Sequence, residues 1–129
     1  MYIILDFDGT VVEHKYPRIG KPNPLAIETI QKIQKAGHKI ILNTYRADCN
    51  DGTLYEAIEY LRKHGIEVDK CNKRKIAPPD WNWNYFKARG IIYIDDICKG
   101  TPLRSSADML SEMVDWNAVS KELYNNIII

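Results

Sequence analysis

Four short apolar runs recur along the chain, and each is followed at once by polar residues. They are almost continuously apolar rather than alternating, which is typical of parallel strands buried on both faces. The runs cover residues 2–5, 39–42, 66–68 and 91–94. We predict that these runs form four parallel strands.

The segments between the first three runs have the spacing of amphipathic helices. One helix is expected after Asn23, a candidate cap, and Pro24, which suits the first helical position; it ends before Gly37. The other begins with a capping box formed by Thr53 and Glu56. Each of the first two strands is therefore followed by a helix.

The second half of the chain is less regular, because prolines interrupt it before the fourth run. We predict a short helix over residues 81–88 that Gly90 closes. Residues 107–113 and 116–124 also have helical spacing, and Asp115 caps the second of these helices.

This order predicts an α/β fold with a doubly wound, Rossmann-like parallel sheet in three layers, α/β/α. The 129 residues suit one domain, so we assign residues 1–129 to a single domain. A net charge of +1 gives no specific nucleic-acid signal and no reason to expect a membrane partner. The first apolar run reaches Asp6 too early for a signal peptide, so we expect a cytoplasmic protein whose three cysteines are reduced.

Ligands of such sheets bind beyond the carboxyl ends of the strands, where this chain carries polar groups. Four aspartates are among these polar groups, and at one edge of the sheet their carboxylates would repel one another in a partly dry site. A divalent cation would relieve this repulsion. Oxygen ligands without His or Cys favour a hard ion, and Mg²⁺ fits best. The strand-end residues, in chain order, are Asp6, Asp8, Thr44, Arg46, Lys73, Asp95 and Asp96.

The same residues, in this order, resemble the motifs of the haloacid dehalogenase superfamily. The segment Asp6-Phe7-Asp8-Gly9-Thr10 matches the first motif, D-x-D-G-T, directly after an apolar strand. Thr44, a lysine and the Asp95-Asp96 pair follow, so the resemblance spans nearly the whole chain. It is closest to the small phosphatase-like members that have no cap domain, which include uncharacterised bacterial and phage-type proteins.

The resemblance implies a Mg²⁺-dependent phosphatase that hydrolyses a phosphate monoester. Asp6 would be the nucleophile that forms an aspartyl-phosphate, and Asp8 would protonate the leaving oxygen and then activate water. Gly9 and Thr10 would complete the substrate-binding turn. The metal ligands would be the Asp6 carboxylate, the Asp8 carbonyl, and Asp95 and Asp96, with Asp95 favoured for direct contact.

Thr44 would hold the transferring phosphoryl oxygens, whereas Arg46 would either grip an anionic group of the substrate or remain solvated. The superfamily's lysine has several candidates here. We favour Lys73, which follows the third strand, then Lys75; Lys87 starts at the far edge of the sheet.

Neither gap between the motifs has room for a cap domain. The first leaves a short flap, residues 11–22, whose basic residues, His14 among them, we expect to be solvated. An open site would admit a phosphorylated small molecule or macromolecule, unless a homo-oligomer supplies a lid. The alternative is a catalytically silent or phospho-accepting regulatory or binding protein on the same fold.

Overall fold

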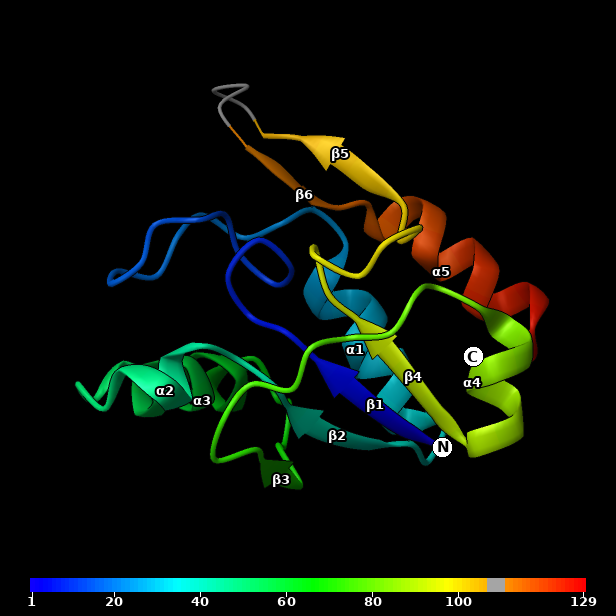
Figure 1. The fold of residues 1–129 in the computed structure, drawn as a ribbon, viewed down its shortest axis with the longest axis horizontal. Coiled ribbons are helices and arrows are strands. Elements are labelled where there is room, and N and C mark those ends of the chain that lie inside the picture. The colour runs from blue at the N-terminus through cyan, green and yellow to red at the C-terminus, as the bar shows by residue number, and fades with distance from the viewer. Residues whose placement is uncertain (107–110) are drawn as a thin grey trace.

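The computed structural model describes residues 1–106 and 111–129. Its centre is a four-stranded parallel sheet in the order β3-β2-β1-β4 (Figure 1). The strands are β1 (Tyr2–Leu5), β2 (Lys39–Leu42), β3 (Lys70–Cys71) and β4 (Ile91–Ile94). The predicted parallel sheet is therefore confirmed, and three of its four strands have the predicted bounds.

Helices follow β1, β2 and β3 as the sequence predicted, and a further short helix, α2, was not predicted. The helices are α1 (Ala26–Lys35), α2 (Arg46–Cys49), α3 (Thr53–Lys63), α4 (Trp83–Arg89) and α5 (Trp116–Asn125). Asp115 caps α5 by accepting the Ala118 amide at 3.2 Å, and Gly90 ends α4 with a φ of 68°. Both of these helix ends confirm the sequence-based prediction.

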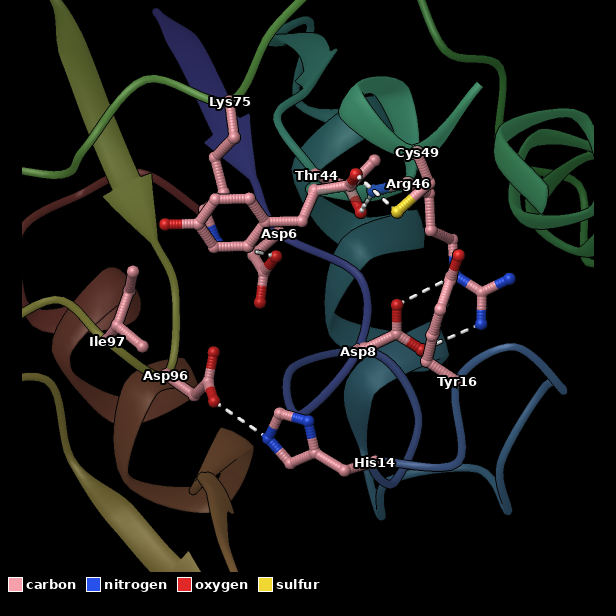
Figure 2. Close-up of a pocket in the computed structure, with 11 residues that line it drawn as sticks. Asp6, Asp8, His14, Tyr16, Thr44, Arg46, Cys49, Lys75, Asp96 and Ile97 are labelled. Atoms are coloured by element: carbon pink, nitrogen blue, oxygen red, sulfur yellow. Dashed lines mark hydrogen bonds and ion pairs between the residues drawn. The ribbon is translucent and has the colours of Figure 1, made fainter. Parts of the chain in front are cut away.

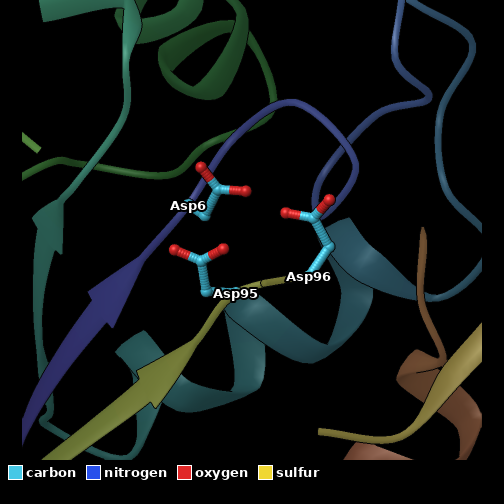
Figure 3. A group of neighbouring side chains, drawn as sticks. All are labelled: Asp6, Asp95 and Asp96. Carbon is cyan, nitrogen blue, oxygen red and sulfur yellow. The ribbon is translucent and has the colours of Figure 1, made fainter. Parts of the chain in front are cut away.

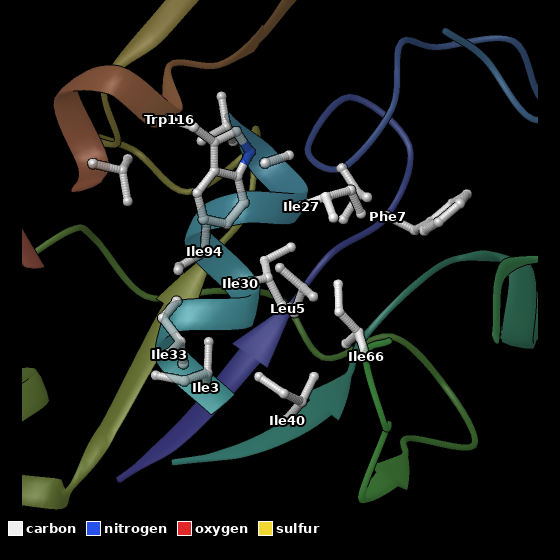
Figure 4. Packing of buried hydrophobic residues seen from close by; sticks show 14 of the residues in the cluster. Ile3, Leu5, Phe7, Ile27, Ile30, Ile33, Ile40, Ile66, Ile94 and Trp116 are labelled. Atoms are coloured by element: carbon white, nitrogen blue, oxygen red, sulfur yellow. The ribbon is translucent and has the colours of Figure 1, made fainter. Parts of the chain in front are cut away.

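The main core lies between the sheet and α1. Ile3 and Leu5 point from β1 towards Ile30 and Ile33 of α1, and Trp116 of α5 closes one end of this layer (Figure 4). These side chains are fully buried. On the opposite face, Phe86 of α4 packs against Tyr93 of β4, with ring centroids 6.3 Å apart.

Because successive strand residues point to opposite faces, α1 and α4 lie on opposite sides of the sheet, as in a Rossmann-like α/β fold. The face of the sheet on the side of α4 is more exposed than the apolar runs predicted. Tyr2 is 52% exposed, and Ile41 and Tyr93 are half-buried. The prediction that every strand is buried on both faces was therefore wrong for this face.

The third strand also differs from the prediction. Ile66 is fully buried and Val68 packs against the core, but the residues that pair with β2 are Lys70 and Cys71. The apolar run at residues 66–68 correctly indicated burial. It did not indicate strand pairing, because pairing depends on which part of the backbone lies beside β2.

Two predicted helix starts are replaced by other contacts. Leu25 precedes α1 in the left-handed conformation, with φ 66°, so Pro24 lies outside the helix. Asn23 instead donates its side-chain amide to the carbonyls of Thr10 and Val114, at 2.8 and 2.7 Å. Thr53 gives its amide and hydroxyl to Asp51, at 3.0 and 2.6 Å, so the expected capping box does not form.

The prediction of a helix over residues 107–113 is wrong for residues 112 and 113. There β6 (Glu112–Val114) pairs antiparallel with β5 (Leu103–Ser105) in a two-stranded sheet. Residues 107–110 lie outside the described part of the chain. Among the helices that the structure describes, none has the length and apolar character needed to cross a membrane.

The register of the sheet determines where the strand-end residues meet. Leu5 of β1 is level with Leu42 of β2 and Ile94 of β4. The next residues along the chain, Asp6, Asn43 and Asp95, consequently emerge together at one edge.

Candidate functional site

A cavity of about 250 Å³ lies at this edge (Figure 2). The strand-end residues of β1 and β2, the flap and the segment after β4 all contribute to it. Its lining contains Asp6, Asp8, His14, Tyr16, Thr44, Tyr45, Arg46, Cys49, Lys75, Asp96 and Ile97.

Asp6 lies at the floor of the cavity and is 3% exposed. Its two carboxylate oxygens have different partners: Lys75 Nζ at 2.9 Å from Oδ1 and the Thr10 hydroxyl at 2.8 Å from Oδ2. Burial raises the pKa of Asp6 well above its ordinary value, and the nearby Asp95 raises it further, whereas Lys75 lowers it. Asp6 is thus a buried, oriented carboxylate that a cationic partner stabilises in its charged form.

Three carboxylates share this floor. Asp6, Asp95 and Asp96 each offer an oxygen, and these oxygens lie within 4.8 Å of one another (Figure 3). Burial raises the pKa of Asp95, an effect that Lys75 opposes. Burial also acts to raise the pKa of Asp96, but hydrogen bonds, first from His14, lower it overall. An all-oxygen set of this density fits a hard divalent cation such as Mg²⁺.

Lys75 is the lysine that reaches these carboxylates. Its ammonium group lies 2.9 Å from Asp6 and 2.8 Å from Asp95, and its side chain is 2% exposed. Lys73, the favoured candidate, is exposed and is not part of the cavity lining; it borders a surface hollow on which Lys75 also lies. The preference for Lys73 over Lys75 is therefore corrected.

The contacts of Asn43 explain why Lys75, and not Lys73, points towards Asp6 and Asp95. Asn43 follows β2, and its side-chain oxygen accepts the Ile76 amide and the Asn72 side-chain amide, both at 2.9 Å. Its own amide donates to the Ile76 carbonyl at 2.8 Å. Both ends of the irregular segment after β3 are thereby held against β2, with Lys75 between them. An asparagine directly after an apolar strand was the sequence signal for this anchor.

Arg46 binds Asp8 and not open solvent. Its Nε and Nη2 donate to the two Asp8 carboxylate oxygens at 2.7 and 2.8 Å. The remaining three N–H groups donate to the carbonyls of Pro17, Arg18 and Thr53. All five donors of the guanidinium are thus engaged, so the expectation of a solvated Arg46 is wrong, and a grip on the substrate would require it to release one of these partners.

Gly9 and Thr10 also have different roles from the substrate contacts expected of them. Gly9 has a φ of +78°, and a Cβ there would lie 2.1 Å from His14 Nε2 and 2.6 Å from Asp96 Oδ2. Its amide donates to the Val12 carbonyl. Thr10 is fully buried beneath Asp6. Gly9 and Thr10 therefore support the floor of the cavity without being part of its lining. Thr44 lines the cavity as expected.

Two flap residues, His14 and Tyr16, line the cavity while remaining exposed to solvent, and the other basic side chains of the flap are exposed as expected. His14 places Nε2 2.9 Å from Asp96, and this hydrogen bond raises the pKa of His14, partly offset by burial. Tyr16 donates its hydroxyl to Asp51, and its ring faces the Arg46 guanidinium at 5.3 Å. Sequence reasoning missed His14, Tyr16 and Tyr45 as parts of the cavity. Nothing in their spacing relates the two flap residues to the strand ends, whereas the place of Tyr45 directly after Thr44 was a signal for it.

Fold and cavity together define a Rossmann-like α/β protein with a cluster of carboxylates at the carboxyl ends of its parallel strands. No model of a known protein family matches the chain, and no curated protein matches it either. A solved structure described as the conserved protein coded by a locus from Bacteroides thetaiotaomicron is 30% identical to it, with a TM-score of 0.65. The match covers 98% of this chain and 91% of that one, and the chain belongs to the same family as that conserved protein.

Proposed function

We propose that the protein is a Mg²⁺-dependent phosphatase of the haloacid dehalogenase type, acting on a phosphate monoester through a phospho-intermediate on Asp6. The observation that carries this proposal is the setting of Asp6. Its buried carboxylate is held between Lys75 and Thr10, next to Asp95 and Asp96, at the end of the first strand. These contacts suit a nucleophile that must stay charged and point in one direction.

The carboxylates of Asp6, Asp95 and Asp96, with the Asp8 carbonyl, would hold the metal. When bound, Mg²⁺ would offset the charge of the carboxylates and of the phosphoryl oxygens. Lys75 would share this task, since its ammonium group already contacts Asp6 and Asp95.

In the first step, an Asp6 oxygen would attack phosphorus while the bond from phosphorus to the ester oxygen breaks. Asp8 would give its proton to the departing oxygen. In the second step, a water oxygen would attack phosphorus, Asp8 would take the proton of that water, and the bond from Asp6 to phosphorus would break. Thr44, on the cavity wall, would hold the transferring phosphoryl group.

Arg46 would position Asp8 for these steps, because its guanidinium binds both oxygens of the Asp8 carboxylate. Proton transfer to the departing oxygen needs an Asp8 oxygen that is free to face it, so we expect Asp8 to leave Arg46, at least partly, when the substrate binds.

The test is Mg²⁺-dependent release of phosphate from p-nitrophenyl phosphate. Asp6→Asn should lower kcat by about 1,000-fold or more, because the amide is a poor nucleophile. Asp48→Asn, at an exposed aspartate of α2, is the matched control and should retain activity. Equal activity of wild type and Asp6→Asn would overturn the proposal. Stable phosphorylation of Asp6 without turnover would instead identify a phospho-accepting protein.

A further inference from the structure

The cavity changes character from its floor to its mouth. The floor is polar and buried, with Asp6 and Thr44 each no more than 3% exposed. The mouth includes the exposed His14 and Cys49, and its large apolar side chains are Tyr45, Ile97 and Tyr16, which are 58%, 52% and 46% exposed. We call these three residues the apolar rim. In Figure 2, Tyr16 and Ile97 stand on opposite sides of the opening.

Two rim side chains are held in place before any ligand arrives. The Tyr16 hydroxyl is bonded to Asp51, and its ring lies against the Arg46 guanidinium. The Tyr45 ring lies 4.8 Å from Lys75 Nζ. A rim that is already ordered loses little conformational entropy on binding, which favours affinity for a ligand that fits it.

Chain connectivity places the rim next to the reacting group. Tyr45 directly follows Thr44, and Ile97 directly follows Asp96, so rim and floor residues alternate along the same two segments. A phosphate monoester with its phosphoryl group on the floor would have to pass its alcohol portion between these side chains. Tyrosine and isoleucine offer that portion flat and apolar surface.

We infer that the substrate is a small phosphate monoester whose alcohol portion carries a ring close to the ester oxygen, and that Tyr45 is the specificity contact for this ring. The inference rests on the proposed function. The cavity volume of about 250 Å³ lies below the usual range for drug-sized ligands, which suits a phosphoryl group with one ring.

The experiment compares benzyl phosphate, cyclohexylmethyl phosphate and ethyl phosphate. All three release an aliphatic alcohol, so kcat/KM reports the contact with the ring more than the chemistry of the leaving group. We expect benzyl phosphate to exceed ethyl phosphate by about 10-fold, with cyclohexylmethyl phosphate between them. Calorimetric titration of benzylphosphonate and ethylphosphonate should give the same preference without turnover.

Tyr45→Ala should lower the ratio of kcat/KM for benzyl phosphate to kcat/KM for ethyl phosphate by about 10-fold. Tyr45→Phe keeps the ring and should retain the preference. Tyr55→Ala is the matched control, because Tyr55 is 75% exposed on α3 and lies outside the cavity lining. Tyr55→Ala should leave kcat/KM unchanged for both esters.

Three results would overturn the inference while leaving the proposed function intact. They are equal hydrolysis of benzyl and ethyl phosphate, an unchanged preference in Tyr45→Ala, and an equal fall for both esters in that variant. The last would mean that Tyr45 acts through Lys75. Failure to hydrolyse any ester, p-nitrophenyl phosphate included, would overturn the proposed function itself and the inference with it.

Discussion

The Arg46 guanidinium binds both carboxylate oxygens of Asp8, and the same guanidinium holds the flap through the carbonyls of Pro17 and Arg18. Arg46 is 1% exposed. One side chain therefore links a candidate catalytic carboxylate to the flap beside the cavity. This link makes the position of Asp8 depend on the flap.

Arg46→Met should lower the free energy of unfolding by about 3–5 kcal/mol, because it leaves the Asp8 carboxylate and three carbonyls without their partner. Urea denaturation followed by circular dichroism measures this loss. Arg62→Met is the matched control: Arg62 makes the same bidentate contact with Glu59, but on the surface, where water replaces it. Equal losses in the two variants would contradict the role of burial.

Lys75→Met should lower kcat by about 100- to 1,000-fold, because it removes the positive charge beside Asp6 and Asp95. Lys73→Met should stay close to wild type, since Lys73 is exposed and does not line the cavity. Steady-state kinetics on p-nitrophenyl phosphate distinguishes the two lysines. A loss confined to Lys73→Met would restore the lysine that the sequence favoured.

Mg²⁺ affinity should fall as the pH is lowered into the range where Asp6 and Asp95 take up protons, which lies above the range for a free aspartate. The pKa values of Asp6 and Asp95 are raised, so these carboxyls hold protons at a pH where a free aspartate is ionised, and each proton competes with the cation. Binding near the raised pKa values should therefore release protons. Calorimetry in buffers of different ionisation enthalpy measures this release. Affinity independent of pH over this range would contradict the prediction.

Gly9→Ala should break the contact between His14 and Asp96, because the new Cβ would occupy the space of the imidazole. The Asp96 hydrogen bond raises the pKa of His14, so its loss should lower that pKa towards the ordinary value of 6.5. Titration of the His14 ring by NMR, in protein without Mg²⁺, reports this change.

The control for this prediction is Gly37→Ala. Gly37 also has a positive φ, of 94°, but a Cβ there would meet nothing within 4 Å. Both variants should lose about 1 kcal/mol or more of stability from backbone strain. The His14 pKa should change in Gly9→Ala alone; the same change in both variants would show that strain, not crowding, is responsible.

Much of the fold could be predicted because it depends on local pattern. Uninterrupted apolar runs located β1, β2 and β4 with the observed bounds. Gly90 and Asp115 marked helix ends because their conformations and hydrogen bonds involve near neighbours in the chain. The strand-end rule then brought Asp6, Asp95 and Asp96 together, since parallel strands in register end at the same edge.

The amino-acid sequence by itself thus determined the parallel strands β1, β2 and β4, most of the helices around them and the carboxylates at the edge of the sheet. Tertiary structure alone decided that Lys75 and not Lys73 reaches Asp6, and that Arg46 binds Asp8. It also decided that His14 enters the site. The physical reason is that these contacts join residues tens of positions apart through irregular segments, where the direction of a side chain depends on distant partners such as Asn43 and not on a repeating backbone.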